Sequence, residues 1–370
     1  MSYRRLVSVT GIAFFPLGFL ARLPYAMTPL ATLILIDDNF TFAGLAGAAQ
    51  SLAMAVSGPV IGVLADRVGQ RAVGLATTLA NIAALFGLLW LAHGSHLAIM
   101  VMAVLAGLTQ PQVGPLVRVH WSHLADDELL PTALAYEAAA DETSFVAGPA
   151  LVGLLTPLGH GVPLLATTAL LGVATLPFAL RQGSPRRQVR RSRSGLLPIG
   201  PLSGMFLAMA AIGAIFGIVQ TGVTAYAPNS AGLIYAEFGV GSALAGAACA
   251  WLPRRFTLRL RYLVFAGTLF VGMIALTLLP VPIGVAVAGV TVAPYMICLY
   301  SLTERLGRRD QAATIMTILC AGGPLGTAAG RAVAGLLVDL HGSAGAFLAA
   351  PGVAAAALVL AAVVVIGRSA

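Results

Sequence analysis

The sequence predicts an all-α integral membrane protein with twelve transmembrane helices, arranged as two pseudo-symmetric six-helix bundles. Its composition excludes a soluble protein, because 59% of the 370 residues are hydrophobic and only 9% are charged, whereas soluble domains carry about 25% charged residues. The apolar residues fall into twelve runs, each close to the length of about 20 residues that a bilayer crossing needs. One basic linker separates the first six runs from the last six, and short sequences recur in both sets.

The twelve predicted spans are bounded by charged residues, Pro or Gly. The first follows Arg4 and Arg5 and is longer than the apolar part of a signal peptide, so we expect it to be retained as a helix. The spans are expected near residues 7–35, 40–65, 72–92, 97–121, 130–156, 161–180, 202–227, 231–252, 262–279, 282–303, 311–338 and 344–366.

Residues 181–198 form the predicted linker, since they combine Arg, Ser and Pro without an apolar run. We therefore expect an N-terminal bundle over residues 1–180 and a C-terminal bundle over residues 199–370. Each bundle would contain six helices.

The two halves resemble each other at an offset of 182 residues. Ala106 to Thr109 matches Ala288 to Thr291, and Gly148 falls on Gly330. Such a parallel repeat predicts a substrate site near the middle of the membrane, between the halves.

Positive charge is concentrated in alternate loops, and the remaining loops contain no Arg. By the positive-inside rule the protein crosses the plasma (cytoplasmic) membrane several times, with both termini cytoplasmic. The net charge of +8 therefore reflects topology, and we expect no nucleic-acid partner. The basic set is Arg4, Arg5, Arg67, Arg71, the segment 181–193, Arg254, Arg255, Arg259, Arg261, Arg305, Arg308 and Arg309; the opposite loops hold Asp37, Asp38, His93, His160 and Asp339.

The predicted fifth span, residues 130–156, carries three acidic residues and is the expected centre of function. An ionised carboxylate at mid-membrane depth costs about 3 kcal/mol, so Glu137, Asp141 and Glu142 need a partner, water or a function to hold them. Glu137 and Asp141 are four residues apart and share a helix face. Two interpretations follow. The carboxylates form structural ion pairs within the bundle, or at least one of them takes up and releases protons during transport.

Arginines inside the first half provide candidate charge partners. Arg118 and Glu137 are each expected about two turns from the cytoplasmic end of their spans, so we predict that they pair. Arg22 is expected near the middle of the membrane, and we predict that it pairs with Asp141 or Glu142. Burial and a neighbouring Arg act in opposite directions on a carboxylate, so a group held between them could exchange a proton with substrate.

The second half has two intramembrane charges, Glu237 and Arg331. Arg331 is expected either to face the central cavity and attract an anionic group or to form an interhelical salt bridge. Polar side chains in spans tend to face inward. The cavity is accordingly expected to be lined by Tyr25, Gln110, Gln112, Gln220, Tyr226 and Tyr295.

Glycine and proline mark expected bends and close helix contacts. Gly148 and Pro149 predict that the fifth span bends and packs closely there, because Pro removes a backbone hydrogen bond and Gly lacks a side chain. Pairs of glycines four residues apart also suit close packing in a membrane; these are Gly58 with Gly62 and Gly326 with Gly330.

The loop between the second and third spans contains the most specific motif, GVLADRVGQR, from Gly62 to Arg71. A tight turn there needs Gly69, and Asp66 and Arg67 can make charge-assisted bonds to a neighbouring helix end. This pattern resembles the cytoplasmic signature of the major facilitator superfamily. The resemblance implies twelve helices and a cytoplasmic latch at Gly62, Asp66, Arg67, Gly69 and Arg71.

Two further patterns resemble that family. Gly148-Pro149 followed by Gly153 is similar to the antiporter-type signature, although its second terminal Gly is missing. Arg118 looks like the family's helix-4 arginine, although the surrounding PLVRVHW departs from the usual pattern. The second-half counterpart of the latch, residues 251–255, keeps its Arg residues but lacks the Asp, so any latch is asymmetric.

Other motifs are absent from the sequence. No P-loop is present, and no nucleophile, base and orienting group occur at a recognisable spacing, so we expect neither an ATP-driven pump nor an enzyme. His120 and His123 alone do not predict a metal site. We expect no cofactor or metal, and a monomer embedded in the lipid bilayer.

The predicted function is secondary transport by alternating access, in which the two halves rock about a central site. We favour a proton-coupled exporter (an antiporter) of small amphipathic molecules or drugs, with protons as the coupling ion, Asp141 and Glu142 as candidate proton carriers and Arg22 as their charge partner. A proton-coupled or facilitative importer of a small polar or anionic solute uses the same parts. A third alternative is a non-transporting receptor or partner protein on the same fold.

Overall fold

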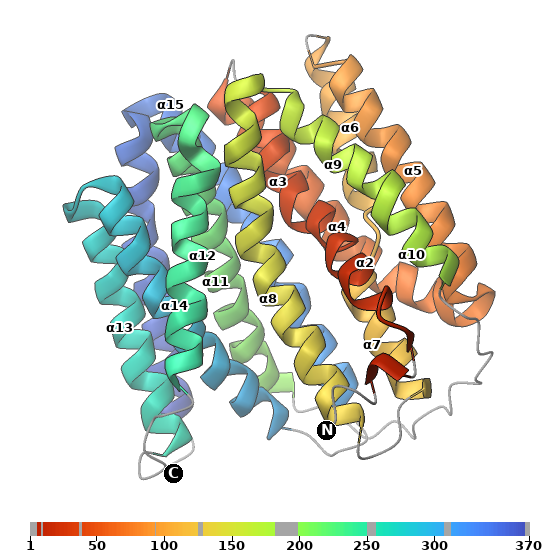
Figure 1. Cartoon of the computed structure of the whole chain (residues 1–370). Coiled ribbons are helices and arrows are strands. Elements are labelled where there is room, and N and C mark those ends of the chain that lie inside the picture. Colours follow the sequence, from red (N-terminus) through yellow and green to blue (C-terminus); the bar gives the residue numbers. More distant parts are fainter. Residues whose placement is uncertain are drawn as a thin grey trace. The chain divides into compact units, whose positions relative to one another are not determined.

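The computed structural model describes residues 6–8, 10–36, 39–92, 94–124, 129–181, 199–249, 257–306 and 312–366. In these residues the chain forms helices joined by short connections, with no strand (Figure 1). This confirms the predicted all-α fold class.

The helices follow the predicted spans closely, with two exceptions. The first and fourth spans each contain a break, where Pro24 and Pro111 lack the N–H that a continuous helix needs. The α-helices are α2 (Phe14–Leu20), α3 (Leu23–Leu35), α4 (Phe40–Val68), α5 (Gln70–Trp90), α6 (His96–Leu108), α7 (Val113–Leu124), α8 (Leu130–Leu155), α9 (Val162–Leu170), α10 (Leu176–Arg181), α11 (Ile199–Tyr226), α12 (Ala231–Ala248), α13 (Leu258–Leu278), α14 (Val281–Glu304) and α15 (Ala312–Ile366), with short segments η1 (Thr156–Leu158), η2 (Leu171–Thr175) and η3 (Pro228–Ser230).

Ten helical segments of the described chain are long and apolar enough to cross a membrane. α8 is not among them, although its 26 residues measure about 39 Å at the usual rise of an α-helix. α15 counts once, although Gly342 interrupts it with a non-helical backbone (φ 71°, ψ −170°). These two features account for the difference between ten and twelve, and the count of twelve stays a prediction.

The chain divides into two compact units. Unit 1 contains Met1–Leu35 and Ala53–Val189, and unit 2 contains Ile36–Leu52 and Arg190–Ala370. The main division falls within the predicted linker, of which the structure describes only Arg181. The first part of α4 clusters with unit 2, although the sequence predicted an N-terminal bundle over residues 1–180.

Unit 1 is built around α3, which packs against α8 and α9, and around α5, which packs against α6, α9 and α10. One core cluster joins aromatic and aliphatic side chains from several of its helices, among them Phe14, Val117, Trp121, Leu129 and Phe178. This cluster surrounds the break between α2 and α3 and so provides apolar surroundings for any charge placed there.

Unit 2 is built around α11 and α15, which lie side by side (Figure 1). A Cβ added at Gly326 would overlap the backbone of Ala210, and one at Gly330 would overlap that of Ala214. The close packing expected at Gly326 and Gly330 is therefore confirmed.

The same expectation is wrong for the other glycine pair. A Cβ at Gly62 would meet no described atom within 4 Å, and one at Gly58 would meet only the Gln112 side chain, at 4.0 Å. Among the described residues, no helix backbone approaches this face of α4 closely enough to require glycine.

The glycines matched at the 182-residue offset make equivalent contacts. Gly148 of α8 lies against Ala26 of α3, so that a Cβ added at Gly148 would be 2.7 Å from the Ala26 Cβ, and Gly330 of α15 lies against Ala214 of α11. In each case the glycine contacts the first predicted span of its own half. This correspondence supports the internal repeat.

We expect Gly326→Ala to lower the free energy of unfolding of the detergent-solubilised protein by about 1–3 kcal/mol, and with it the melting temperature. The reason is that the added methyl group overpacks the α11–α15 contact. Gly267→Ala in α13 is the matched control, since its Cβ would meet nothing within 4 Å and Ala favours a helix over Gly. Equal melting temperatures for the two variants would contradict the packing described.

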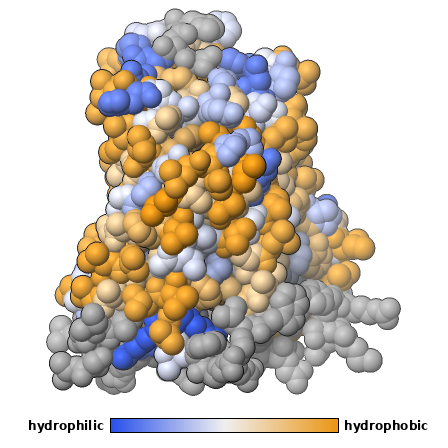
Figure 2. Space-filling view, turned by 90° about the vertical axis from the view of Figure 1, so that its left-hand side faces the viewer, coloured by the Kyte–Doolittle hydropathy of each residue, from blue (hydrophilic) through white to orange (hydrophobic). Residues whose placement is uncertain are grey.

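Apolar side chains cover the face of unit 2 near α13 and α14. Val264, Val271, Leu278 and Ile283 are each more than half exposed. Figure 2 views the molecule from this side and shows hydrophobic residues across the middle, with hydrophilic residues nearer the ends. This distribution suits helices that contact lipid.

Candidate functional site

The break between α2 and α3 places a charged residue inside unit 1. Arg22 follows Ala21 at the break, and Pro24 occupies the second position of α3. The Thr175 hydroxyl donates to the Ala21 carbonyl at 3.2 Å, so part of the backbone released by the break is bonded to another helix. The interruption lets the Arg22 side chain leave the helix axis toward α8.

Arg22 binds two carboxylates of α8 at once. Its Nε donates to Oδ1 of Asp141 at 2.8 Å, and its Nη2 donates to Oε2 of Glu137. Its Nη1 donates to the Gly18 carbonyl at 2.7 Å. The predicted Arg22–Asp141 pair is therefore present, and Glu137 joins it because residues four apart in a helix share a face.

The two carboxylates differ in their surroundings. Glu137 is fully buried, and its Oε1 accepts a hydrogen bond from the Trp121 indole N–H at 2.7 Å. The Asp141 side chain is 25% exposed and lies near Gly114 of α7, where an added Cβ would be 3.1 Å from its Oδ1. Glu137 is thus held between two donors, whereas Asp141 is reachable from outside the core.

Aromatic rings enclose the buried side of this cluster. Phe14 contacts Trp121 edge to face at 5.4 Å between ring centroids, and it contacts Phe178 at 5.2 Å. Such apolar surroundings strengthen the attraction between the charges and make an unpaired charge costly.

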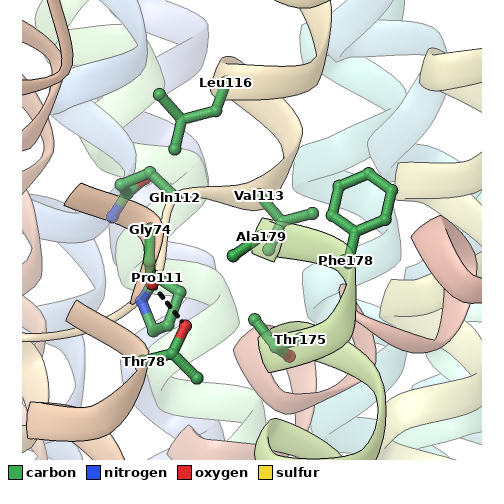
Figure 3. Close-up of a pocket in the computed structure, with 9 residues that line it drawn as sticks. All are labelled: Gly74, Thr78, Pro111, Gln112, Val113, Leu116, Thr175, Phe178 and Ala179. Carbon is green, nitrogen blue, oxygen red and sulfur yellow. Dashed lines mark hydrogen bonds between the residues drawn. The ribbon is translucent and has the colours of Figure 1, made fainter. Parts of the chain in front are cut away.

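A small cavity adjoins this aromatic group. It measures about 10 Å³, which is close to the minimum for one water molecule. Figure 3 shows Gln112, Thr78 and Thr175 around it, together with Phe178 of the aromatic group. The Thr78 hydroxyl donates to the Gly74 carbonyl at 2.7 Å.

Several predicted residues in the first half lie outside the described side chains. The Arg118 side chain is among them, so its predicted pairing with Glu137 stays a prediction, although both oxygens of Glu137 already accept from Arg22 and Trp121. The side chain of Glu142 is likewise not described. The same holds for Asp66, His120 and His123, and for residues 251–255.

The turn of the latch motif is described. Gly69 joins α4 to α5 with φ 107°, a value that residues with side chains rarely adopt. This confirms that the turn needs glycine. Arg67 and Arg71 beside it are exposed.

In unit 2, Arg331 of α15 is 1% exposed, and its hydrogen-bond partners among the described residues are all neutral. Its Nη1 donates to the Gly47 carbonyl at 3.1 Å and to the Ser51 hydroxyl at 2.9 Å, and its Nη2 donates to Oε1 of Gln220. Its Nε has no partner among the described residues. The alternative of an interhelical salt bridge is therefore not found there, and the guanidinium lacks a described counter-ion.

Arg331 belongs to a wider contact between α15 and the first part of α4. The Asp339 carboxylate accepts from the Thr41 backbone N–H at 2.7 Å, and Asn39 caps the same helix end by accepting from Phe42. We call this contact, made by Asp339 with Thr41 and by Arg331 with Gly47 and Ser51, the α4–α15 clasp. Acceptors at a helix N-terminus are favourably placed for its exposed N–H groups.

We expect Gln220→Glu to raise the melting temperature of the purified protein, because the isosteric carboxylate supplies a counter-charge that Arg331 does not have among the described residues. Gln220→Leu is expected to lower the free energy of unfolding by about 1–3 kcal/mol, since it leaves the buried Nη2 of Arg331 without the acceptor Oε1 of Gln220. The two variants form a matched pair. A destabilised Gln220→Glu protein would show that the charge of Arg331 is already compensated.

The predicted cavity residues come from both units and differ in their surroundings. Tyr295 is fully buried and its hydroxyl lies 3.0 Å from that of Tyr262, so it serves packing within unit 2. Tyr25 contacts Phe145 edge to face, and Tyr226 is 48% exposed. Gln110 is buried at the break before α7, with no described partner for its side-chain oxygen Oε1.

Sequence reasoning missed Trp121 as a partner of Glu137. The available signal was an indole N–H inside a span, since a buried Trp N–H needs an acceptor. It also missed Gly18, Gly47 and Ser51, because a backbone carbonyl or a lone hydroxyl leaves no pattern in the sequence.

The chain is similar to known proteins in family and in fold. The family model described as Major Facilitator Superfamily matches residues 12–319. No curated protein matches the sequence. Among solved structures, a variant of the nucleoside transporter NupG is similar with a TM-score of 0.77 and 14% identity, covering 95% of this chain and 98% of that one.

Two other solved structures share the fold over nearly their whole length. The POT family transporter PepTSo gives a TM-score of 0.74 at 12% identity, covering 96% of this chain and 97% of that one. The human organic anion transporter MFSD10 (TETRAN) gives a TM-score of 0.64 at 18% identity, covering 97% of this chain and 99% of that one.

Proposed function

The chain belongs to the Major Facilitator Superfamily and is a non-enzymatic membrane transporter, and we propose that it exports small amphipathic molecules in exchange for protons. The transport follows an alternating-access cycle. The observation that carries the proposal is the arrangement of one arginine and two carboxylates in unit 1.

The charge of this cluster supports proton coupling. Arg22 contributes one positive charge, and Glu137 and Asp141 contribute two negative charges when both are ionised. Binding of one proton makes the cluster electrically neutral, which favours movement through an apolar environment. The cluster therefore has the composition of a site that gains and loses one proton.

Asp141 is the proposed carrier within the cluster. Its side chain is 25% exposed, whereas Glu137 is fully buried between two donors. Protonation of Asp141 would weaken its bond to the Arg22 Nε and leave the Arg22–Glu137 pair in place. A substrate arriving near Asp141 could then promote release of the proton, which couples the two movements.

The other predicted elements complete the proposal. Alternating access would require the α4–α15 clasp to open during the cycle. The basic loops support a plasma-membrane protein with both termini in the cytoplasm, and Asp66, Arg67 and Arg71 would form the cytoplasmic latch. Gly148, Pro149 and Gly153 would allow α8 to bend as the carboxylates change partners.

Arg331 favours a second candidate function, the import of a small anionic solute. A buried guanidinium without a described counter-ion could bind a carboxylate or phosphate group of a substrate once the clasp opens. In this case the anion, and not an amphipathic molecule, would be the transported species.

The proposed function is tested with purified protein in liposomes that contain a pH-sensitive dye. An imposed proton gradient is combined with a panel of cationic, neutral and anionic amphiphiles. We expect proton movement that depends on substrate, in the direction opposite to substrate flux. Flux of anions together with protons would support the importer, and a complete absence of flux would argue against both.

A further inference from the structure

A groove between α12 and α14 of unit 2 contains a carboxylate that the proposed mechanism does not use. Its volume is about 500 Å³, within the range of about 300–1,000 Å³ that is typical of small-molecule sites. One residue in its lining, Glu237, is ionisable, and the others are apolar. Its larger side chains are those of Leu233, Glu237, Val240 and Leu244 from α12 and of Val287 and Val290 from α14.

Glu237 has no hydrogen bond or ion pair with any residue that the structure describes. It is exposed and lies one residue from the centre of the membrane-spanning segment Pro228–Ala248. An ionised carboxylate at that depth costs at least about 3 kcal/mol unless a partner compensates it. The Arg331 side chain, which is the other intramembrane charge of unit 2, donates to Ser51, Gly47 and Gln220 and not to Glu237.

The surroundings of Glu237 specify the partner. Apolar walls favour an apolar ligand body, and the single carboxylate favours one positive charge. No hydroxyl, amide or aromatic side chain occurs among the described residues of the groove lining, so recognition would rest on charge and apolar contact without directional hydrogen bonds. An anion of the same shape as such a cation would be repelled by the Glu237 carboxylate. A neutral molecule would leave the negative charge of Glu237 without a counter-charge.

The depth of Glu237 distinguishes between two sources of such a cation. The amine of a phospholipid lies in the headgroup region, about 15 Å from the centre of a hydrocarbon core that is about 30 Å thick. A free lipophilic cation can enter the core and reach the middle of the span. We propose that the α12–α14 groove binds lipophilic organic monocations, with Glu237 as the counter-ion.

This proposal rests on the proposed export function in one respect, because it names the charge class of the amphipathic substrate. The groove shares no residue with the Arg22 cluster. It can therefore be tested by equilibrium binding, without a gradient and without transport.

The experiment measures binding of tetraphenylphosphonium to the full-length protein in nanodiscs of phosphatidylcholine. Tetraphenylborate, an anion of the same shape, is the matched ligand control. We expect saturable binding of the cation and weaker specific binding of the anion. Glu237→Gln is expected to weaken cation binding about tenfold or more, since it removes the counter-charge, whereas Glu237→Asp retains most of it.

A second variant tests the place of binding independently of charge. Val287→Trp fills the groove and is expected to weaken cation binding while Glu237 stays in place. Each variant is first checked for a monodisperse elution profile. Cation binding that is unchanged in Glu237→Gln, or a wild-type protein that prefers the anion, would overturn the proposal.

Two further measurements distinguish a free cation from a lipid headgroup, and failure of the groove proposal from failure of the export proposal. Replacing the nanodisc lipid with phosphatidylethanolamine is expected to leave cation affinity unchanged, and competition by that lipid would assign the groove to a headgroup amine and overturn the proposal. Binding that depends on Glu237 without flux in liposomes would keep the site and refute the exporter. Proton-coupled flux without such binding would refute the site alone.

Discussion

Replacing Asp141 with Asn is expected to abolish substrate-dependent proton movement in liposomes while the protein remains folded. Asn keeps the size of the side chain and an oxygen that can accept from the Arg22 Nε, but it does not exchange a proton. The partly exposed carboxylate is the member of the Arg22 cluster best placed to exchange one. The measurement is the dye signal on addition of substrate, compared with wild type at equal protein.

Substrate exchange without a gradient provides the control for this variant. We expect Asp141→Asn to retain counterflow of substrate, because binding and the conformational change do not need net proton transfer. Glu142→Gln is the neighbouring comparison and is expected to keep proton movement. Loss of proton movement in Glu142→Gln but not in Asp141→Asn would assign the carrier to Glu142 and contradict the mechanism.

Replacing Arg22 with Met is expected to destabilise the protein by about 3–5 kcal/mol, the typical cost of breaking a buried ion pair by removing one partner. Glu137 would stay fully buried with only the Trp121 indole as a described donor. The Asp141 carboxylate would add a second negative charge on the same helix face. The measurement is thermal unfolding of the detergent-solubilised protein.

The double variant Arg22→Met with Glu137→Gln is expected to recover most of this loss, because a neutral amide can still accept from Trp121 and leaves no buried charge unpaired. Arg181→Met serves as the matched control, since Arg181 is exposed at the end of α10. A single Arg22→Met variant as stable as this control would show that the ion pair contributes little.

Much of the architecture was predictable from local sequence. The apolar runs predicted the helices because a membrane span has to satisfy its own backbone hydrogen bonds, and length and composition then suffice to identify it. Gly69 was predictable because a turn with positive φ favours glycine. The breaks near Pro24 and Pro111 were not predicted, although both prolines carry the physical reason for them.

The partners of the charged residues were only partly predictable. The Arg22–Asp141 pair followed from matching depths in two spans, and depth depends only on position along each helix. Trp121 was missed because depth does not fix how each helix is rotated about its axis. Rotation depends on side-chain packing between helices.

The sequence by itself determined that this chain is an all-helical membrane protein of the Major Facilitator Superfamily, with acidic residues in a span where they need partners. Only the tertiary structure decided that Arg22 is shared by Glu137 and Asp141, that Arg331 has neutral partners, and that Glu237 lies in an apolar groove. The reason is physical. Hydrophobicity and turn chemistry act along the chain, whereas burial and charge pairing arise from residues far apart in sequence that packing brings together.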